Sequence, residues 1–237
     1  MSAFDLKIIA LVAMFIDHFA VIFGWRLELV SEFVPMLRMV GRLTFPIFVY
    51  FIGVGFRHTS DIHKYLMRLG IFAIISEIPF DIALRNARTY PEFPIVWLEF
   101  GRQNVFFTLF LGLLAAYIFK KVFEDWRYAI VLPLPFAGAI FVNADFGIVG
   151  MVMVFACAVL NRKAYQLAAI MIGGLMLHRH LDGSMLIMMN VGYVVAIGLI
   201  ALYSGRQGPR MKWMFYAFYP LHFLVLFGLL MIYEAFV

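Results

Sequence analysis

The sequence predicts an all-α protein, a polytopic transmembrane helical bundle of about nine spans. Of its 237 residues, 65% are hydrophobic and only 14% are charged, whereas soluble domains contain about 45–50% apolar and about 25% charged residues. The apolar residues form long runs, and about 20 helical residues cross the hydrocarbon core of a bilayer. A soluble domain of this length could not bury so much apolar surface. We therefore expect one integral membrane domain over residues 1–237.

Charged clusters and Pro or Gly breaks divide the apolar residues into nine candidate spans. These are residues 5–24, 38–56, 63–83, 104–122, 128–143, 146–161, 164–180, 184–203 and 212–236. The fifth, sixth and seventh are short for a bilayer, so eight or ten spans also fit the pattern. Pro133 and Pro135 predict a kink or an early start in the fifth span. The first span carries Asp17 and lacks a nearby cleavage site, so we interpret it as retained and not as a signal peptide.

The basic residues indicate the orientation of these spans. With nine spans, most of the 19 Lys and Arg residues fall on the side of the N-terminus. Cytoplasmic loops of membrane proteins carry the excess of positive charge. We therefore predict a multi-pass membrane protein with the N-terminus in the cytoplasm and the C-terminus outside.

Five ionisable side chains lie inside the predicted spans, namely Asp17, His18, Glu77, Asp81 and His222. A charged side chain at the centre of a span costs about 2.5–3.5 kcal/mol on insertion scales, so such residues usually face a polar interior. Counted at 1.5 Å per helical residue, the five fall in the outer half or near the middle of the membrane. Arg42, Asn104 and Asp145 lie at the outer ends of their own spans. This shared depth predicts one polar cavity.

Two carboxylates within one span need a partner. Glu77 and Asp81 are four residues apart and therefore share a helix face. They repel each other unless a cation lies nearby, and Arg38 and Arg42 are the nearest candidates. The alternative is an ion pair of Arg42 with Glu77 or Asp81 that only joins two helices, although such a pair could also line the cavity.

Histidine is the side chain best suited to general base chemistry near neutral pH. His18 is the first candidate base, with Asp17, Glu77 or Asp81 as the group that orients it. His222 is the second, and Tyr216 and Tyr219 precede it at a spacing of three. The alternatives are a buried, hydrogen-bonded His18 that joins two helices, and tyrosines that act as interface anchors.

A cationic cluster follows the second predicted span on the cytoplasmic side. It consists of Arg57, His58, Lys64 and Arg68. Such a cluster can bind the phosphates of a nucleotide-bearing donor. The alternative is that the cluster only reflects the positive charge that is typical of cytoplasmic loops.

The segment 85–103 is too polar and too interrupted by proline to span a membrane. Its aromatic residues are Tyr90, Phe93, Trp97 and Phe100. On the outer side, the segment could form a lid over the cavity or an aromatic belt on the lipid headgroups.

Neither a metal nor a nucleic-acid partner is predicted. Cys157 is the only cysteine and lies in an apolar run, and His178 and His180 flank a charged residue at a span end. The net charge of +5 is spread over short loops, as membrane topology requires.

Eight segments, in consistent order over nearly the whole chain, resemble the TraX family of membrane proteins. They are residues 16–18 (IDH), 41–48 (GRLTFPIF), 55–59 (GFRHT), 64–69 (KYLMRL), 76–81 (SEIPFD), 104–109 (NVFFTL), 145–147 (DFG) and 218–222 (FYPLH). Phe146 departs from the family pattern, in which tyrosine is commoner.

The resemblance implies an acyl-CoA-dependent acyltransferase, with N-acetyl transfer as the first expectation. The acyl group would pass from cytoplasmic acetyl-CoA to an amine or hydroxyl acceptor, such as the N-terminus of a pilin. In that interpretation Tyr216 and Tyr219 join the cationic cluster in binding the donor. Arg42, Asn104 and Asp145 would bind the acceptor or stabilise the oxyanion.

Two other function classes stay open. Chains of intramembrane acids and histidines are also typical of proton-coupled transporters, although this chain has no clear internal repeat of the kind that many transporters contain. In a non-catalytic scaffold for pilus or envelope assembly, the polar residues would serve stability alone.

Overall fold

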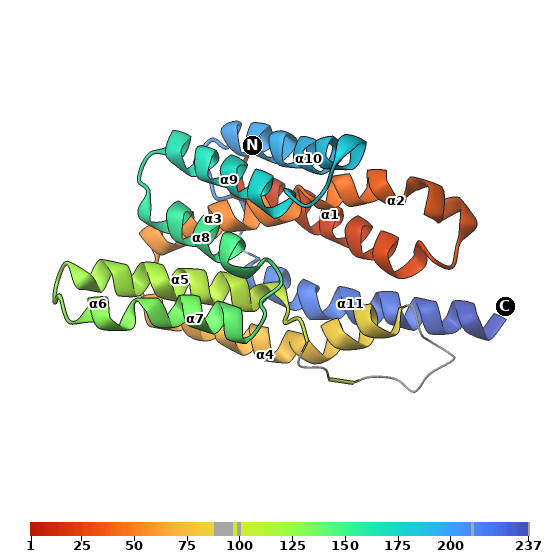
Figure 1. The fold of residues 1–237 in the computed structure, drawn as a ribbon, viewed down its shortest axis with the longest axis horizontal. Helices are drawn as coiled ribbons and strands as arrows, with labels where there is room; N and C mark the ends of the chain where they lie inside the picture. Colours follow the sequence, from red (N-terminus) through yellow and green to blue (C-terminus); the bar gives the residue numbers. More distant parts are fainter. Residues whose placement is uncertain (88–96, 99–100, 210, 237) are drawn as a thin grey trace. The chain divides into compact units, whose positions relative to one another are not determined.

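The computed structural model describes residues 1–87, 97–98, 101–209 and 211–236 (Figure 1). Within these ranges every regular element is an α-helix, and the one strand-like contact is an isolated bridge between Gln103 and Ala144. The helices are α1 Ala3–Phe23, α2 Glu28–Gly41, α3 Thr44–His58, α4 Ile62–Asn86, α5 Val105–Val122, α6 Tyr128–Val131, α7 Pro133–Phe141, α8 Gly147–Val159, α9 Lys163–Leu177, α10 Gly183–Ala201 and α11 Lys212–Phe236. The predicted all-α class is confirmed.

Five helical stretches of the described residues are long and apolar enough to cross a bilayer. They are α1, Glu28–His58 (α2 and α3), α5, α10 and Trp213–Phe236 of α11. Three further apolar helices are shorter, at Tyr128–Phe141, Gly147–Val159 and Lys163–Leu177. The structure therefore supports a helical membrane protein, but length and composition alone give five spans and not nine. The predicted third span is not among the five, because charged residues interrupt α4.

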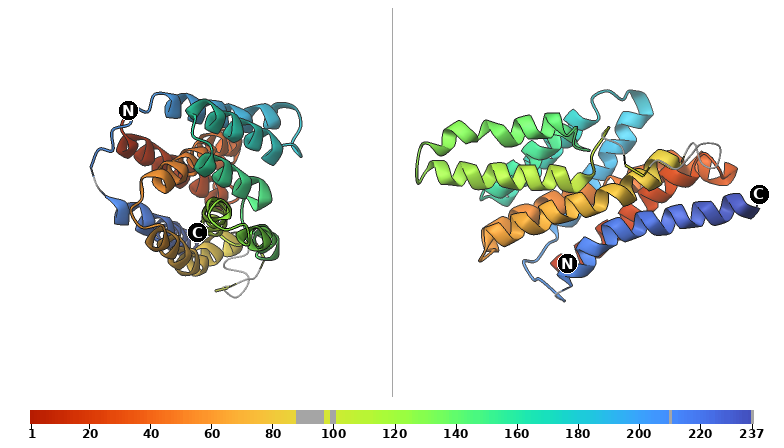
Figure 2. Two further views of the ribbon diagram at one scale, coloured as in Figure 1. Left: turned by 90° about the vertical axis from the view of Figure 1, so that its left-hand side faces the viewer. Right: turned by 90° about the horizontal axis from the view of Figure 1, so that it is seen from below.

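The helices pack as two compact units. The first comprises Met1–Ile47, Ile75–Glu99 and Leu181–Val237, and the second comprises Phe48–Ile74 and Phe100–His180. In the first unit α1 packs against α2 and α11, and α2 packs against α10. In the second unit α5 packs against α7 and α8, and α8 against α9; α5 and α7 run side by side in Figure 2. That the units form one domain stays a prediction.

Glycines bring the helices of the first unit close together. A Cβ on Gly41 of α2 would overlap the side chain of Asp17 on α1. A Cβ on Gly192 of α10 would lie 2.6 Å from the Cβ of Arg42. Small residues at such contacts let helix backbones approach in a membrane, where packing replaces the hydrophobic effect as the driving force. The sequence 38–42 is therefore held between α1 and α10.

The predicted span 38–56 was wrong at its start. The chain is already helical from Glu28, and α2 and α3 are separate helices with a turn at Arg42 and Leu43. Pro46 explains the break, because it lacks the N–H that would bond to the carbonyl of Arg42 in a continuous helix. The residues before 38 were missed because Glu28 and Pro35 make α2 look like a loop.

The fifth predicted span is interrupted as expected. α6 ends at Val131, and Pro133 starts α7. Proline is well suited to the first turn of a helix, because a backbone N–H at that position has no carbonyl partner within the helix. The prediction of a kink or an early start is confirmed.

The predicted lid segment 85–103 lies largely outside the described residues, which omit 88–96 and 99–100. Tyr90, Phe93 and Phe100 belong to the omitted part. Trp97 is described and is 65% exposed. Both the lid and the aromatic belt therefore stay predictions.

The N-terminus fixes the start of α1 to the connection between α10 and α11. The amide of Ala3 donates to the carbonyl of Arg206 at 2.8 Å, and the amide of Phe4 donates to that of Gln207 at 3.1 Å. Gly208 has φ +70°, and a Cβ there would lie 2.9 Å from Phe4 Cβ. These bonds set where α11 begins relative to α1, and so they help to position the residues that meet across the two helices.

Candidate functional site

His18 of α1 and His222 of α11 meet in a hydrogen bond. His18 Nδ1 lies 2.7 Å from His222 Nε2, between residues 204 positions apart in the sequence. The ring centroids are 4.9 Å apart and the ring planes differ by 24°. Because two ring atoms are so close, this centroid distance means that the rings meet edge to edge and nearly in one plane. The geometry is that of a linear hydrogen bond and not of a stacked pair.

The hydrogen bonds of the pair assign its protons. His222 Nδ1 lies 3.0 Å from the carbonyl oxygen of Phe218. A carbonyl only accepts, so His222 Nδ1 must carry a hydrogen. In a neutral His222 the other nitrogen, Nε2, then accepts from His18 Nδ1–H. A neutral His18 is left with its lone pair on Nε2, which is the basic atom of the pair.

Aromatic rings hold both imidazoles in place. Phe218 stacks on His222 with ring centroids 5.2 Å apart and planes 9° apart. Phe223 contacts His18 at 4.5 Å and His222 at 4.2 Å, measured between ring centroids. Tyr219 lies edge-on to His222 at 5.5 Å. His222 is only 3% exposed, whereas His18 is partly exposed, so His18 is the member of the pair that a substrate can reach.

Asp17, next to His18, forms an ion-pair cluster on the side of α2. Arg38 Nη1 donates to Asp17 Oδ2 at 2.9 Å, and Arg42 Nη2 donates to Asp17 Oδ1 at 3.1 Å. The three side chains are 33%, 16% and 10% exposed for Arg38, Arg42 and Asp17. Partly buried groups of this kind are hydrogen-bonded because an unpaired charge is costly in apolar surroundings. The cluster joins α1 to α2 and places two guanidinium groups beside the residue that precedes His18.

From the sequence we considered an ion pair of Arg42 with Glu77 or Asp81, and that pair stays a prediction beside the observed pair of Arg42 with Asp17. α2 runs beside α1, so Arg38 and Arg42 reach Asp17. It also means that the carboxylate of Asp17 binds the two arginines, while His18 takes His222 as its partner.

Glu77 and Asp81 are both buried, at 5% and 0% exposure. Asp81 Oδ1 lies 3.7 Å from Arg85 Nε, one turn further along α4. Phe80, between the two acids, packs edge-on against Phe223 at 5.6 Å between ring centroids. α4 therefore reaches the aromatic shell of the histidine pair through Phe80.

Asn104 and Asp145 belong to the second unit. Asn104 begins α5: its side-chain oxygen accepts from the amide of Phe106 at 3.0 Å, and its Nδ2 donates to the carbonyl of Ala73 at 2.7 Å. Asp145 is paired with Arg102 Nε at 2.8 Å. Both side chains thus have structural partners. Their predicted roles at the substrate stay predictions.

The predicted donor-binding cluster also lies in the second unit, and its members differ in what they contact. Arg57 Nη1 donates to the carbonyl of Cys157 at 2.7 Å, at the C-terminal end of α8. Lys64 pairs with Asp61 at 3.1 Å, and the backbone N–H of Lys64 lowers the pKa of the Asp61 carboxyl by donating to it. Arg68 lies over the Tyr65 ring at 5.8 Å.

A phosphate would suit these cations unequally. The charge of Arg57 is already directed at helix carbonyls, and that of Lys64 at a carboxylate. His58 is exposed and its Nδ1 lies 2.9 Å from the carbonyl of Val54. Among the described residues Arg68 has no carboxylate partner, so it fits a phosphate best. Tyr216 and Tyr219 belong to the first unit, where Tyr219 packs on His222.

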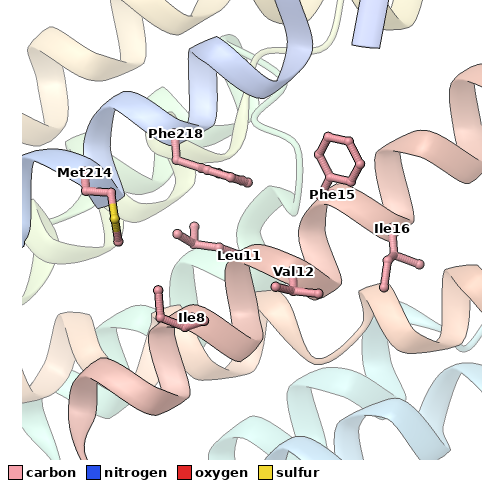
Figure 3. Close-up of a pocket in the computed structure, with 7 residues that line it drawn as sticks. All are labelled: Ile8, Leu11, Val12, Phe15, Ile16, Met214 and Phe218. Atoms are coloured by element: carbon pink, nitrogen blue, oxygen red, sulfur yellow. The ribbon is translucent and has the colours of Figure 1, made fainter. Parts of the chain in front are cut away.

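A cavity of about 300 Å³ lies between α1 and α11 (Figure 3), and one of its lining residues, Phe218, stacks on His222. Its lining is apolar and consists of Ile8, Leu11, Val12, Phe15, Ile16, Met214 and Phe218. This cavity is therefore not the polar chamber that the sequence predicted. Within the described residues no group of three or more metal-binding side chains occurs.

Chemically, the histidine pair can accept a proton at His18 Nε2 and share it through the bond to His222. The resulting imidazolium would lie against π-faces of Phe223 and Phe218, which favour a cation. The sequence singled out both histidines, but nothing in it indicated that they touch. Phe218 and Phe223 were missed as their supports, because aromatic residues are common in any membrane helix.

Comparison with known proteins places these residues in a family. The family profile described as "TraX protein" matches residues 2–230. A curated relative, the probable fimbrial assembly protein FimC, serogroup H1, of Dichelobacter nodosus, is 31% identical over 243 residues, which cover 95% of this chain and 94% of the relative. No solved structure matches the chain. The match over nearly the whole length shows that this protein is a member of the TraX family.

Proposed function

We propose that the protein is a membrane-embedded acyltransferase that acts in pilus assembly. It moves an acyl group, with acetyl as the first candidate, from acyl-CoA to an amine or hydroxyl acceptor such as the N-terminus of a pilin subunit. The observation that carries the proposal is the histidine pair, which leaves a basic nitrogen on the partly exposed His18. The family and the relative named for fimbrial assembly support the pilus context.

The reaction needs one proton to move. His18 Nε2 removes a proton from the acceptor amine, whose nitrogen then attacks the carbonyl carbon of the thioester. An oxyanion forms on the carbonyl oxygen, and a guanidinium such as that of Arg42 stabilises it. When the intermediate collapses, the carbon–sulfur bond breaks, and the proton held by His18 passes to the departing thiolate. The products are the acylated acceptor and free CoA.

The other site residues support this step. His222 accepts the Nδ1 hydrogen of His18 and so keeps the lone pair on Nε2. Asp17 holds Arg38 and Arg42 in place. Glu77 and Asp81, both buried on α4, stay candidates for the group that orients the base.

Binding of the donor phosphates is a separate part of the proposal, and Arg68 is its first candidate because no described carboxylate neutralises it. Arg68→Gln should raise the KM for acetyl-CoA several-fold while kcat changes little, because the side chain contributes to donor binding and not to the chemical step. The control is Arg179→Gln, an exposed arginine of the second unit without a proposed role.

For the membrane arrangement we propose nine spans, with the N-terminus in the cytoplasm of a bacterial inner membrane. The five long apolar helices and three shorter ones supply most of them, and α4 would supply another. The distribution of basic residues sets the direction.

A second candidate function is a non-catalytic assembly factor. The relative's name favours it, because that name states assembly and not catalysis. Such a factor would bind a pilus subunit without releasing CoA from acetyl-CoA.

The deciding experiment uses the full-length protein in nanodiscs, with acetyl-CoA and a peptide that has a free α-amine. Release of the CoA thiol and acetylation of the peptide, measured by mass spectrometry, report the reaction. Substitution of His18 by alanine should lower the rate by about 10²–10⁴-fold, the usual contribution of a general base. His180→Ala is the matched control, because His180 is exposed and has no proposed role. Equal rates for His18→Ala and the wild-type protein would refute the assignment of the base.

A further inference from the structure

The apolar cavity between α1 and α11 is an open groove. Five of its lining residues come from two successive turns of α1, and Met214 and Phe218 extend toward them from α11 (Figure 3). All seven lining side chains are hydrocarbon or thioether, so no polar group inside the groove selects a polar ligand. Apolar hollows of this size are typical of sites for hydrophobic ligands.

Two contacts between α1 and α11 mark the ends of the groove. At one end the ammonium of Lys7 lies 5.2 Å from the centroid of the Phe215 ring. At the other end His18 is bonded to His222. His18 follows Lys7 by eleven positions on α1, which corresponds to about 16 Å along the helix. The groove thus runs from a cationic end to the histidine pair.

The length of the groove and its lining suit a hydrocarbon chain. From Ile8 to Ile16 it follows about 12 Å of helix. Its cavity of about 300 Å³ offers only apolar contacts, so the part of a ligand that it binds is apolar.

We propose that this groove binds one acyl tail of an anionic phospholipid, whose headgroup lies at Lys7. A hydrocarbon chain matches the apolar lining of the groove. The charge of Lys7 at the end of the groove complements a phosphate, and a basic residue near a membrane surface attracts an anionic lipid by about fivefold in affinity. Trp213, exposed at the start of α11 near this end, is a residue type that occupies the headgroup level.

This lipid would have a consequence for the histidines. Phe218 lines the groove and also stacks on His222, whose Nδ1 bonds to the carbonyl of the same Phe218. A bound acyl tail therefore lies one ring away from His222. The lipid site itself does not depend on the proposed transferase activity.

The test measures lipid binding directly. The full-length protein is purified in detergent and titrated with phosphatidylglycerol or phosphatidylcholine, and bound lipid is counted by native mass spectrometry. We expect one phosphatidylglycerol retained with about fivefold preference over phosphatidylcholine. Val12→Trp fills the groove and should abolish retention. Val194→Trp is the control, because Val194 on α10 is equally exposed (54%, against 55% for Val12) but lies outside the groove.

Lys7→Gln separates the headgroup from the tail. It should remove the preference for phosphatidylglycerol and leave binding of the two lipids about equal. The proposal is overturned if Val12→Trp retains lipid as the wild-type protein does, or if Lys7→Gln keeps the preference. It is also overturned if an apolar helical peptide displaces the lipid competitively. Circular dichroism of each variant verifies that the fold is intact.

Discussion

At the scale of single residues, the candidate site depends on which atoms of His18 and His222 carry hydrogens. The carbonyl of Phe218 requires a hydrogen on Nδ1 of His222. Nε2 of a neutral His222 then accepts, so the hydrogen of the bond between the rings is on Nδ1 of His18. A peptide carbonyl cannot donate a hydrogen bond. Only one assignment of donors and acceptors is therefore possible when both rings are neutral. The proposed base is therefore assigned to one atom, His18 Nε2, and not only to a residue.

This order predicts different results for two substitutions of His222. His222→Gln keeps an acceptor for His18 Nδ1–H and should retain activity within about tenfold. His222→Leu removes the acceptor, so the hydrogen of His18 is no longer held on Nδ1. This substitution should lower the rate of acetyl transfer by about 10–100-fold. The measurement is the rate of acetyl transfer as a function of pH. If glutamine and leucine lower the rate equally and leave the pH profile unchanged, His222 has only a packing role.

Gly41 is a second residue whose effect is predictable. Its Cβ position is filled by the side chain of Asp17, so Gly41→Ala should destabilise the protein by about 1–3 kcal/mol, the range for overpacking. Gly228→Ala on α11 is the matched control, because no atom from another part of the chain lies within 4 Å of its Cβ position. Alanine there should stabilise the helix by about 0.5–1 kcal/mol. Unfolding in mixed micelles with increasing dodecyl sulfate measures both, and equal effects would contradict the predicted packing.

At the scale of helices, α1 is the element around which the site is organised. One side of it binds α2 through Asp17, and another meets α11 through His18. Adjacent residues point about 100° apart on a helix, since a turn takes 3.6 residues. Asp17 therefore contacts α2, while the adjacent His18 contacts α11. This explains why the acid does not orient the histidine that follows it.

The link between α1 and α2 predicts a measurable coupling. Asp17→Asn leaves Arg38 and Arg42 without their carboxylate and should destabilise the protein by about 2 kcal/mol. This is less than the roughly 3–5 kcal/mol of a fully buried pair, because Arg38 is one-third exposed. Adding Arg42→Gln to Asp17→Asn should cost less than the two changes separately. A double-mutant cycle of unfolding free energies measures this coupling, with exposed Asp182→Asn as the control. Strict additivity would mean that the ion pair does not contribute.

Long apolar helices were predictable from the sequence, and α2 was not. α1, α5 and α10 begin and end within two residues of their predicted bounds, because backbone groups in lipid must bond within the helix and the hydropathy pattern reflects this. α2 carries Glu28 and Pro35, which interrupt its apolar residues, so a search for uninterrupted apolar runs missed its first ten residues. Its packing against α1 and α10 was not predictable from a local pattern.

At the scale of the whole molecule, the sequence and the structure bear on different questions. Helices long enough to span occur in the described residues, but the direction in which they cross rests on charge alone. The basic residues are concentrated on one side when nine spans are counted. The testable prediction for the whole molecule is therefore the direction in which its helices cross the membrane.

Cysteine labelling can test the orientation, because the chain has one cysteine, Cys157, and it is buried. Ser60→Cys, between α3 and α4, should react with a membrane-impermeant maleimide only after the cells are permeabilised. Ser184→Cys, at the start of α10, should react in spheroplasts that are still intact. Both serines are exposed, and the wild-type protein is the unlabelled control. The opposite labelling pattern would invert the topology, and labelling of both from outside would refute nine spans.

Composition and hydropathy alone establish that this is a helical membrane protein, because the cost of leaving backbone and polar groups unsatisfied in lipid acts on every residue along the chain. The order of the eight matching segments along the chain also indicates its family. The contacts of the site have a different origin. Asp17 meets two arginines and His18 meets His222 because α1 packs between α2 and α11, and such contacts join residues far apart in sequence. Only the packing of the folded helices decides them, since hydrogen-bond and ion-pair partners are selected by distance in space.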